Sequence, residues 1–217
     1  MLLRIRVRLP DRPGSLGRVA RTLGAAGADV AQMAVLERGD GRALDDFTVG
    51  WPAGAAPGPL HDGLASVPGV EVLGIWPTGE PCGAFPDAAV IGQVAAVPER
   101  GAEILADAVP AILSAGWAGL AEVGADGAAA LVYASVGGAA PAELPALAPV
   151  RPRSFTAPDG AHFALCPLSG GPLSTSAVIL VVSRTGAPPF HRTEVLRLEQ
   201  LAGAAGAVLS AGLPLAP

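Results

Sequence analysis

Asp11-Arg12-Pro13-Gly14-Ser15-Leu16 is the stretch that decides the fold of the first third of this 217-residue chain. An alternating strand is expected before it, over residues 3–9, and a helix after it, with Ser15 as the N-cap. Pro13 fixes one backbone angle, and the first helical turn leaves several N–H groups free, so these groups gather on one small surface. That surface suits a carboxylate or another small anion, which favours a ligand-binding regulatory module over a catalyst.

The segments that follow predict a small α+β domain. The helix is expected to end at Gly24 or Gly27, and the turn Arg38-Gly39-Asp40-Gly41 joins two strands in a hairpin. A second helix closes at Pro68-Gly69. The resulting order is ferredoxin-like, βαββαβ, which folds as a four-stranded antiparallel sheet with both helices on one face. The later elements are expected at residues 30–36, 43–51, 60–67 and 70–76.

The pattern changes beyond residue 77, where a short segment is rich in Pro and Gly. We therefore expect a first domain at residues 1–77, a linker at residues 78–85 and a second domain at residues 86–217. No internal repeat relates the two domains, because the second half lacks the Asp-x-Pro-Gly stretch.

The second domain is expected to have a central antiparallel sheet. A helix over residues 99–116 is predicted to kink or split at Pro110, and Asp126-Gly127 is typical of a hairpin turn. Residues 137–152 are predicted to be loop with a short helix. The other expected elements are strands at 119–123, 128–136, 161–168 and 177–183 and a helix at 190–210.

The composition excludes several chemistries and partners. The chain has no lysine, which removes Schiff-base formation, a P-loop and a Ser–Lys pair, and no asparagine, which removes glycosylation sequons. A net charge of −5 gives no general attraction to nucleic acid. The longest uncharged stretch, residues 161–183, is interrupted by Pro and Gly, and three arginines near the N-terminus argue against a signal peptide. We expect a soluble cytoplasmic protein that does not enter a membrane.

The first domain resembles the ACT domain, a small regulatory module that binds amino acids. The quoted stretch matches the family's Asp-x-Pro-Gly-x-Leu loop, and residues 16–30 match the helix and second strand that follow it. The resemblance implies an amino-acid effector, usually held at a homodimer interface. The family often has Asn at the position of Asp29, where a carboxylate can accept a hydrogen bond from an α-ammonium group and repels an acidic side chain. The implied ligand-binding residues are Asp11, Pro13, Gly14, Ser15, Leu16, Ala28, Asp29 and Val30.

The second domain resembles a compact GAF domain. The resemblance rests on the hairpin at Asp126-Gly127, on the strand Val178-Ile179-Leu180-Val181-Val182-Ser183-Arg184, and on Pro189-Phe190 before the closing helix. In that family the closing helix often pairs with a second copy. GAF domains bind cyclic nucleotides, haem, small acids or no ligand, and no strict ligand motif is present in this chain.

Several residues have both a functional and a structural interpretation. Arg4, Arg6 and Arg8 project from the sheet face opposite the helices, and we expect a solvated face paired with acids such as Asp46 rather than a phosphate-binding or dimer patch. Asp45 and Asp46 are neighbours in a strand and point to opposite faces, so they cannot act as one acid–base pair. Trp117 and Tyr133 are expected in the core.

The cysteines and histidines show no pattern typical of a redox or metal site. Cys166 is expected to be a small buried hydrophobe. The alternative is a redox role, because some GAF-like proteins are cysteine-dependent methionine-sulfoxide reductases. Such an enzyme also needs a resolving thiol, and Cys82 would have to supply it. His61, His162 and His191 lack metal-ligand spacing, so neither a metal nor a cofactor is expected.

Together these features predict a non-catalytic sensor that binds an amino acid, forms a homodimer and passes its signal to a separate effector protein or through self-association. The alternatives are a redox enzyme that uses Cys166 and a purely structural dimer without a ligand.

Overall fold

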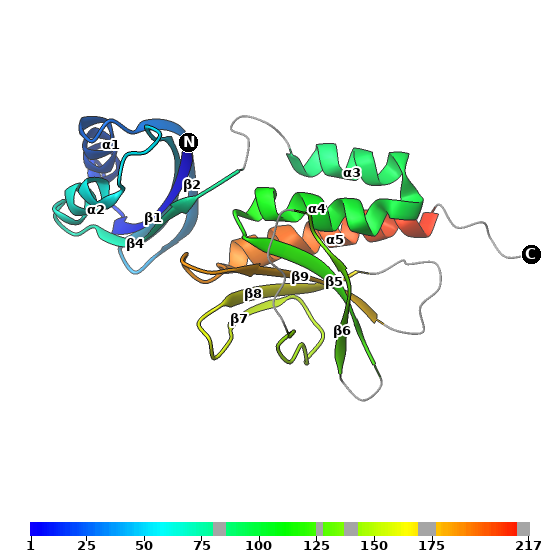
Figure 1. Cartoon of the computed structure of the whole chain (residues 1–217). Coiled ribbons are helices and arrows are strands. Elements are labelled where there is room, and N and C mark those ends of the chain that lie inside the picture. Colours follow the sequence, from blue (N-terminus) through cyan, green and yellow to red (C-terminus); the bar gives the residue numbers. More distant parts are fainter. Residues whose placement is uncertain (80–85, 125–127, 137–142, 169–176, 212–217) are drawn as a thin grey trace, which may run out of the picture. The chain divides into compact units, whose positions relative to one another are not determined.

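The computed structural model describes residues 1–79, 86–124, 128–136, 143–168 and 177–211, which form two compact units (Figure 1). The first unit holds the N-terminal sheet, and the second holds the elements from residue 86 onward. The expected turn at Asp126-Gly127, Cys82 and nearly all of the expected linker at 78–85 lie outside the described residues. The domain boundaries given above therefore remain predictions.

The first unit has the expected βαββαβ order and confirms the ferredoxin-like prediction. Its four strands form an antiparallel sheet in the order β2-β3-β1-β4, so β2 and β4 are the edges. Both helices cover one face of this sheet (Figure 1). The elements are β1 (Leu2–Pro10), α1 (Ser15–Ala25), β2 (Asp29–Gly39), β3 (Arg42–Gly50), α2 (Gly58–Ala65) and β4 (Glu71–Pro77).

The core of the first unit follows from the alternation of β1. Leu3, Ile5, Val7 and Leu9 all point to the helix side and are nearly inaccessible to solvent. They pack with residues from the other strands and from one side of each helix. These partners include Val19, Leu23, Phe47, Val49, Leu60 and Leu64.

The start of α1 differs from the prediction by one residue. The helix begins at Ser15, and the N-cap position is Gly14, whose φ of 86° is left-handed. Ser15 is buried, and no side chain caps the helix. The prediction of Ser15 as N-cap was wrong because a glycine in the left-handed conformation already turns the chain from β1 into α1.

The second unit confirms a central antiparallel sheet, in the order β6-β5-β9-β8-β7. The helices α3, α4 and α5 cover one face (Figure 1), and their apolar residues share a core with that face. A second cluster fills the other face, where Leu147 packs on Trp117, Phe163 and Ile179. The elements are α3 (Pro86–Ala96), the 3-10 turn η1 (Pro98–Arg100), α4 (Gly101–Leu113), β5 (Trp117–Val123), β6 (Ala129–Ala134), β7 (Arg153–Thr156), β8 (His162–Leu168), β9 (Ala177–Arg184) and α5 (Arg192–Ala211).

The second unit differs from the sequence-based prediction in several of its elements. Helix α3 and strand β7 were not anticipated, and no helix is present in the described part of residues 137–152. Helix α4 runs through Pro110 as one element, because Val109 and Ile112 on either side of it pack into the same core. The antiparallel pairing of β5 with β6 confirms the expected hairpin strands.

Candidate functional site

The N-terminus of α1 presents free backbone donors. Ser15 N–H donates to Arg12 O at 3.2 Å, and Arg18 N–H donates to Gly14 O at 3.2 Å. The N–H groups of Leu16 and Gly17 make no hydrogen bond within the described residues, as is usual for the first turn of a helix. Since Leu16 is exposed, these donors are accessible to a small anion.

Charged side chains surround this helix start. Asp11 carries an ion pair with Arg38, with Oδ1 3.5 Å from Nη2, and Asp11 N–H donates to Gly41 O. Asp45 faces the same side of the sheet and is only 3% exposed, and its Oδ1 has no hydrogen-bond partner in the part of the chain that the structure describes. Burial raises the pKa of Asp45, and the negative charges of Asp11 and Asp46 raise it further, whereas Arg38 lowers it.

The structure separates the two halves of the predicted ligand site. Asp29 pairs with Gly50, which pairs with Leu2, so Asp29 lies at the start of β1. Asp11 follows the last residue of β1. The two ends of this nine-residue strand are roughly 26 Å apart at a rise of about 3.3 Å per residue. Within one chain, residues 11–16 therefore lie far from Ala28, Asp29 and Val30.

The sheet face opposite the helices carries buried charge. Arg6 binds Asp46 through two hydrogen bonds, Nε to Oδ1 at 2.7 Å and Nη2 to Oδ2 at 2.8 Å, and Arg4 Nε lies 3.0 Å from Asp46 Oδ2. The predicted pairing with Asp46 is confirmed. The expectation of a solvated face was wrong for Arg4 and Arg6, which are 8% and 2% exposed, because one carboxylate serves both guanidinium groups and Trp76 covers Arg6 at 5.5 Å. Arg8 is half-exposed and pairs with Glu71.

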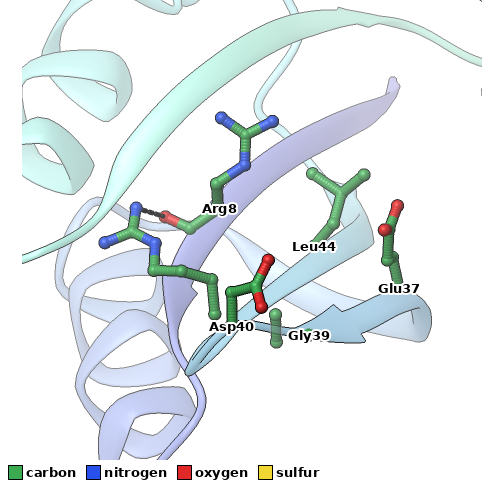
Figure 2. A pocket seen from close by; sticks show the side chains of 7 residues that line it. Arg8, Glu37, Gly39, Asp40 and Leu44 are labelled. Carbon is green, nitrogen blue, oxygen red and sulfur yellow. Dashed lines mark hydrogen bonds between the residues drawn. The ribbon is translucent and has the colours of Figure 1, made fainter.

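Two cavities with polar lining residues lie outside the predicted ligand site. One, of about 240 Å³, lies at the β2–β3 hairpin and is lined by Arg8, Glu37, Arg42 and Leu44 among others (Figure 2). The other, of about 450 Å³, lies between α3 and α5 beside Asp87 and Gln200. The sequence signal for the first was the charged hairpin itself, which was interpreted only as a turn.

The cysteine, aromatic and histidine side chains considered in the second unit have structural surroundings. Cys166 is buried, as expected, and burial raises its pKa to about 11, which disfavours the nucleophilic thiolate. Trp117 is in the core, as expected, whereas the hydroxyl of the partly exposed Tyr133 donates to Asp107 Oδ2 at 2.8 Å. His162 is hydrogen-bonded to Thr156, and burial lowers its pKa. Within the described residues, no group of three His, Cys, Asp or Glu side chains is arranged to hold a metal ion.

None of the described helices combines the length and the apolar character needed to cross a bilayer.

Comparison with known proteins identifies the first unit. Residues 3–50 match the family model of the ACT domain. No curated protein matches the chain. The match points to a ligand-binding regulatory protein and confirms the resemblance carried by residues 11–16.

Solved structures similar to the chain include two GAF domains and one enzyme. The GAF domain of a putative sensor histidine kinase from Pseudomonas syringae pv. tomato is 16% identical, with 58% of this chain and 85% of that chain covered and a TM-score of 0.40. The GAF domain of an Acinetobacter phosphoenolpyruvate-protein phosphotransferase is 11% identical, with 58% and 91% covered and a TM-score of 0.42. A formyltetrahydrofolate deformylase from Pseudomonas putida KT2440 is 14% identical, with a TM-score of 0.32, and the match covers 46% of this chain and only 40% of the deformylase.

Proposed function

We propose that this protein is a non-catalytic amino-acid sensor in which the first unit binds the amino acid at the interface of a homodimer. The observation that carries the proposal is the exposed start of α1, where Gly14 offers no capping side chain and the N–H groups of Leu16 and Gly17 have no partner among the described residues. The ACT match over residues 3–50 supports an amino acid as the ligand. The amino acid's carboxylate binds these N–H groups, and the helix dipole adds to the attraction.

A second copy supplies the other half of the site. Strand β2 is an edge, and its side chains Val30 and Val35 are 40% and 46% exposed. An edge strand offers unpaired N–H and C=O groups that a second copy can complete. In an antiparallel β2–β2 pair centred on Ala34, Asp29 of the second copy lies opposite Gly39 and so comes close to Asp11 and Arg38.

The charges of this two-copy site suit the amino group of the ligand. Asp29 of the second copy accepts a hydrogen bond from the α-ammonium, while Arg38 balances Asp11 on the other side. Acidic amino acids bind poorly, because Asp11, Asp29 and the nearby Asp45 repel a second carboxylate.

A thermal-shift screen against the twenty amino acids tests the proposal. A ligand at about 100 times its dissociation constant adds about 2.7 kcal/mol to the folded state, which is a shift of several degrees. Gly14→Val and Asp29→Ala should each abolish the shift, whereas Asp62→Ala, which removes an exposed acid on α2, should preserve it. A shift that survives both site variants, or the lack of any shift with the wild type, contradicts the proposal.

The sensor acts through a second protein and catalyses no reaction itself. No cofactor takes part, and ligand binding changes the geometry of the dimer, which a separate effector protein detects. The second unit transmits this change in dimer geometry to the effector protein. Leu147 packs on its sheet face opposite the helices, and we assign the amino acid to the first unit because the ACT match lies there.

A further inference from the structure

The pocket at the β2–β3 hairpin is a second candidate binding site, on the opposite face of the sheet from α1. Arg8, Leu44 and Glu37 stand side by side on β1, β3 and β2, because Leu44 pairs with Arg8 on one side and with Glu37 on the other. Directly opposed side chains have Cβ atoms about 5 Å apart, so the three form one continuous row. Figure 2 shows Arg8 and Glu37 on either side of Leu44.

The basic side of the pocket consists of two guanidinium groups. Arg8 Nη1 lies 2.8 Å from Glu71 Oε2, whereas Arg42 reaches the same oxygen only at 4.0 Å and donates to Arg8 O at 3.4 Å. These contacts hold both side chains above the sheet while most of their N–H groups have no partner within the described residues. Two guanidinium groups side by side suit a carboxylate, because each can donate two parallel N–H hydrogen bonds to its oxygens.

The acidic side comes from the hairpin. Glu37 and Asp40 both line the pocket, and Asp40 is held in place by a left-handed φ of 53° in the turn. The carboxylate of Asp40 has no hydrogen bond or ion pair within the described residues, although Arg8 and Arg42 line the same pocket. Asp40 therefore faces the two guanidinium groups in this pocket without an ion pair to either of them within the described residues.

The size and the floor of the hollow restrict the ligand further. Its volume of about 240 Å³ lies below the roughly 300–1,000 Å³ of sites for drug-sized ligands. Leu44 supplies an apolar floor that is only 9% exposed. A single amino acid fits this space.

We infer that this pocket binds a small zwitterion, with the carboxylate on Arg8 and Arg42, the ammonium on Asp40, and the carbon chain over Leu44. The site lies entirely within one chain. The proposed site at α1 instead needs Asp29 of a second copy, which the β2–β2 pair places opposite Gly39 at the edge of this pocket.

Backbone amide NMR of the full chain tests the inference, with the twenty common amino acids as probes. We expect at least one of them to shift the Gly39 amide saturably. For that probe, the deaminated acid and the decarboxylated amine should bind about tenfold more weakly, because each lacks one of the two charged ends.

Matched variants complete the test. Arg42→Gln and Asp40→Asn should each weaken the Gly39 response about tenfold, while Arg21→Gln and Asp62→Asn, which remove exposed charges from the helices, should leave it unchanged. Gly14→Val should remove any response at Gly17 but keep the response at Gly39, so the failure of one site is distinguishable from the failure of the other. The inference is overturned if no amino acid shifts Gly39, if either half-probe binds as well as the whole, or if both pocket variants bind normally.

Discussion

Gly14 and Gly24 show how the same residue type has opposite effects at the two ends of α1. Gly14 has a φ of 86°, which L-residues with a side chain rarely adopt, while Gly24 lies inside the helix. A Cβ atom added at either position meets no heavy atom within 4 Å. The effect of a substitution therefore comes from the backbone alone.

The first prediction compares alanine at these two glycines. Gly14→Ala should lower the free energy of unfolding by about 1–2 kcal/mol, the cost of a left-handed conformation. Gly24→Ala should raise it by about 0.5–1 kcal/mol, because alanine loses less backbone entropy in a helix. Urea unfolding of the two variants measures both effects, and changes of equal sign would contradict this account.

The neighbours Asp45 and Asp46 lie on opposite faces of β3 and should respond oppositely to loss of charge. Asp46→Asn leaves the buried Arg4 and Arg6 without their carboxylate and should cost about 3–5 kcal/mol. Asp45→Asn removes a buried charge with an unpartnered oxygen and should increase stability at pH 7.

The pH dependence gives the sign of the Asp45 effect. Because the folded-state pKa of Asp45 is raised, the folded protein takes up this proton at a higher pH than the unfolded chain does. The wild type should therefore gain stability relative to Asp45→Asn as the pH falls through the raised pKa toward the ordinary value. Thermal unfolding between neutral and mildly acidic pH measures this difference, and a constant difference would refute the assignment.

Cys166 should be chemically inert in the folded protein. Its thiol is buried and has a pKa of about 11, so the reactive thiolate is scarce at neutral pH. In a Cys82→Ser background, alkylation of Cys166 by a maleimide should be no faster than unfolding. Fast alkylation of the native state would instead favour a redox role.

At the scale of whole elements, one buried ion pair ties α5 to the sheet of the second unit. Arg184 at the end of β9 binds Glu194 at the start of α5 through two hydrogen bonds, at 2.9 and 3.0 Å. Its guanidinium also donates to Leu113 O and stacks at 4.0 Å on Phe190. The C-terminal end of α4 and the first turn of α5 therefore meet at one side chain.

Loss of this pair should be costly. Glu194→Gln leaves Arg184 buried without a counter-charge and should lower the free energy of unfolding by about 3–5 kcal/mol. The control is Asp87→Asn, which breaks the half-exposed Asp87–Arg197 pair between α3 and α5 and should cost about 0–1 kcal/mol. Calorimetric unfolding separates the two, and similar losses would argue against burial as the cause.

The elements that sequence patterns predicted are those with a strong periodicity of their own. The alternation of β1 and the helical spacing of Val19 and Leu23 are visible without any partner. Strand β7 has only four residues and exists because it pairs with β8. Helix α3 buries Val90 and Val94 against a core that the rest of the unit provides.

At the scale of the whole molecule, the sensor proposal requires β2 to be the contact between two copies. Val35→Lys places a charge on this exposed edge and should convert the dimer to a monomer and remove amino-acid binding. Val132→Lys, on the exposed edge strand β6 of the second unit, should do neither. Light scattering after gel filtration measures the mass, and a dimer that survives Val35→Lys places the interface elsewhere.

The sequence by itself determined the strand–helix order of the first unit, the turn at Pro13-Gly14 and the burial of Cys166. These features depend on local backbone preference and on hydrophobic periodicity, which neighbouring residues encode. Only the tertiary structure decided that Asp11 and Asp29 lie at opposite ends of the sheet, that Asp46 is buried between Arg4 and Arg6, and that Arg8, Leu44 and Glu37 line one pocket. These arrangements depend on which strands pair and in which register, and register joins residues that are far apart in the chain.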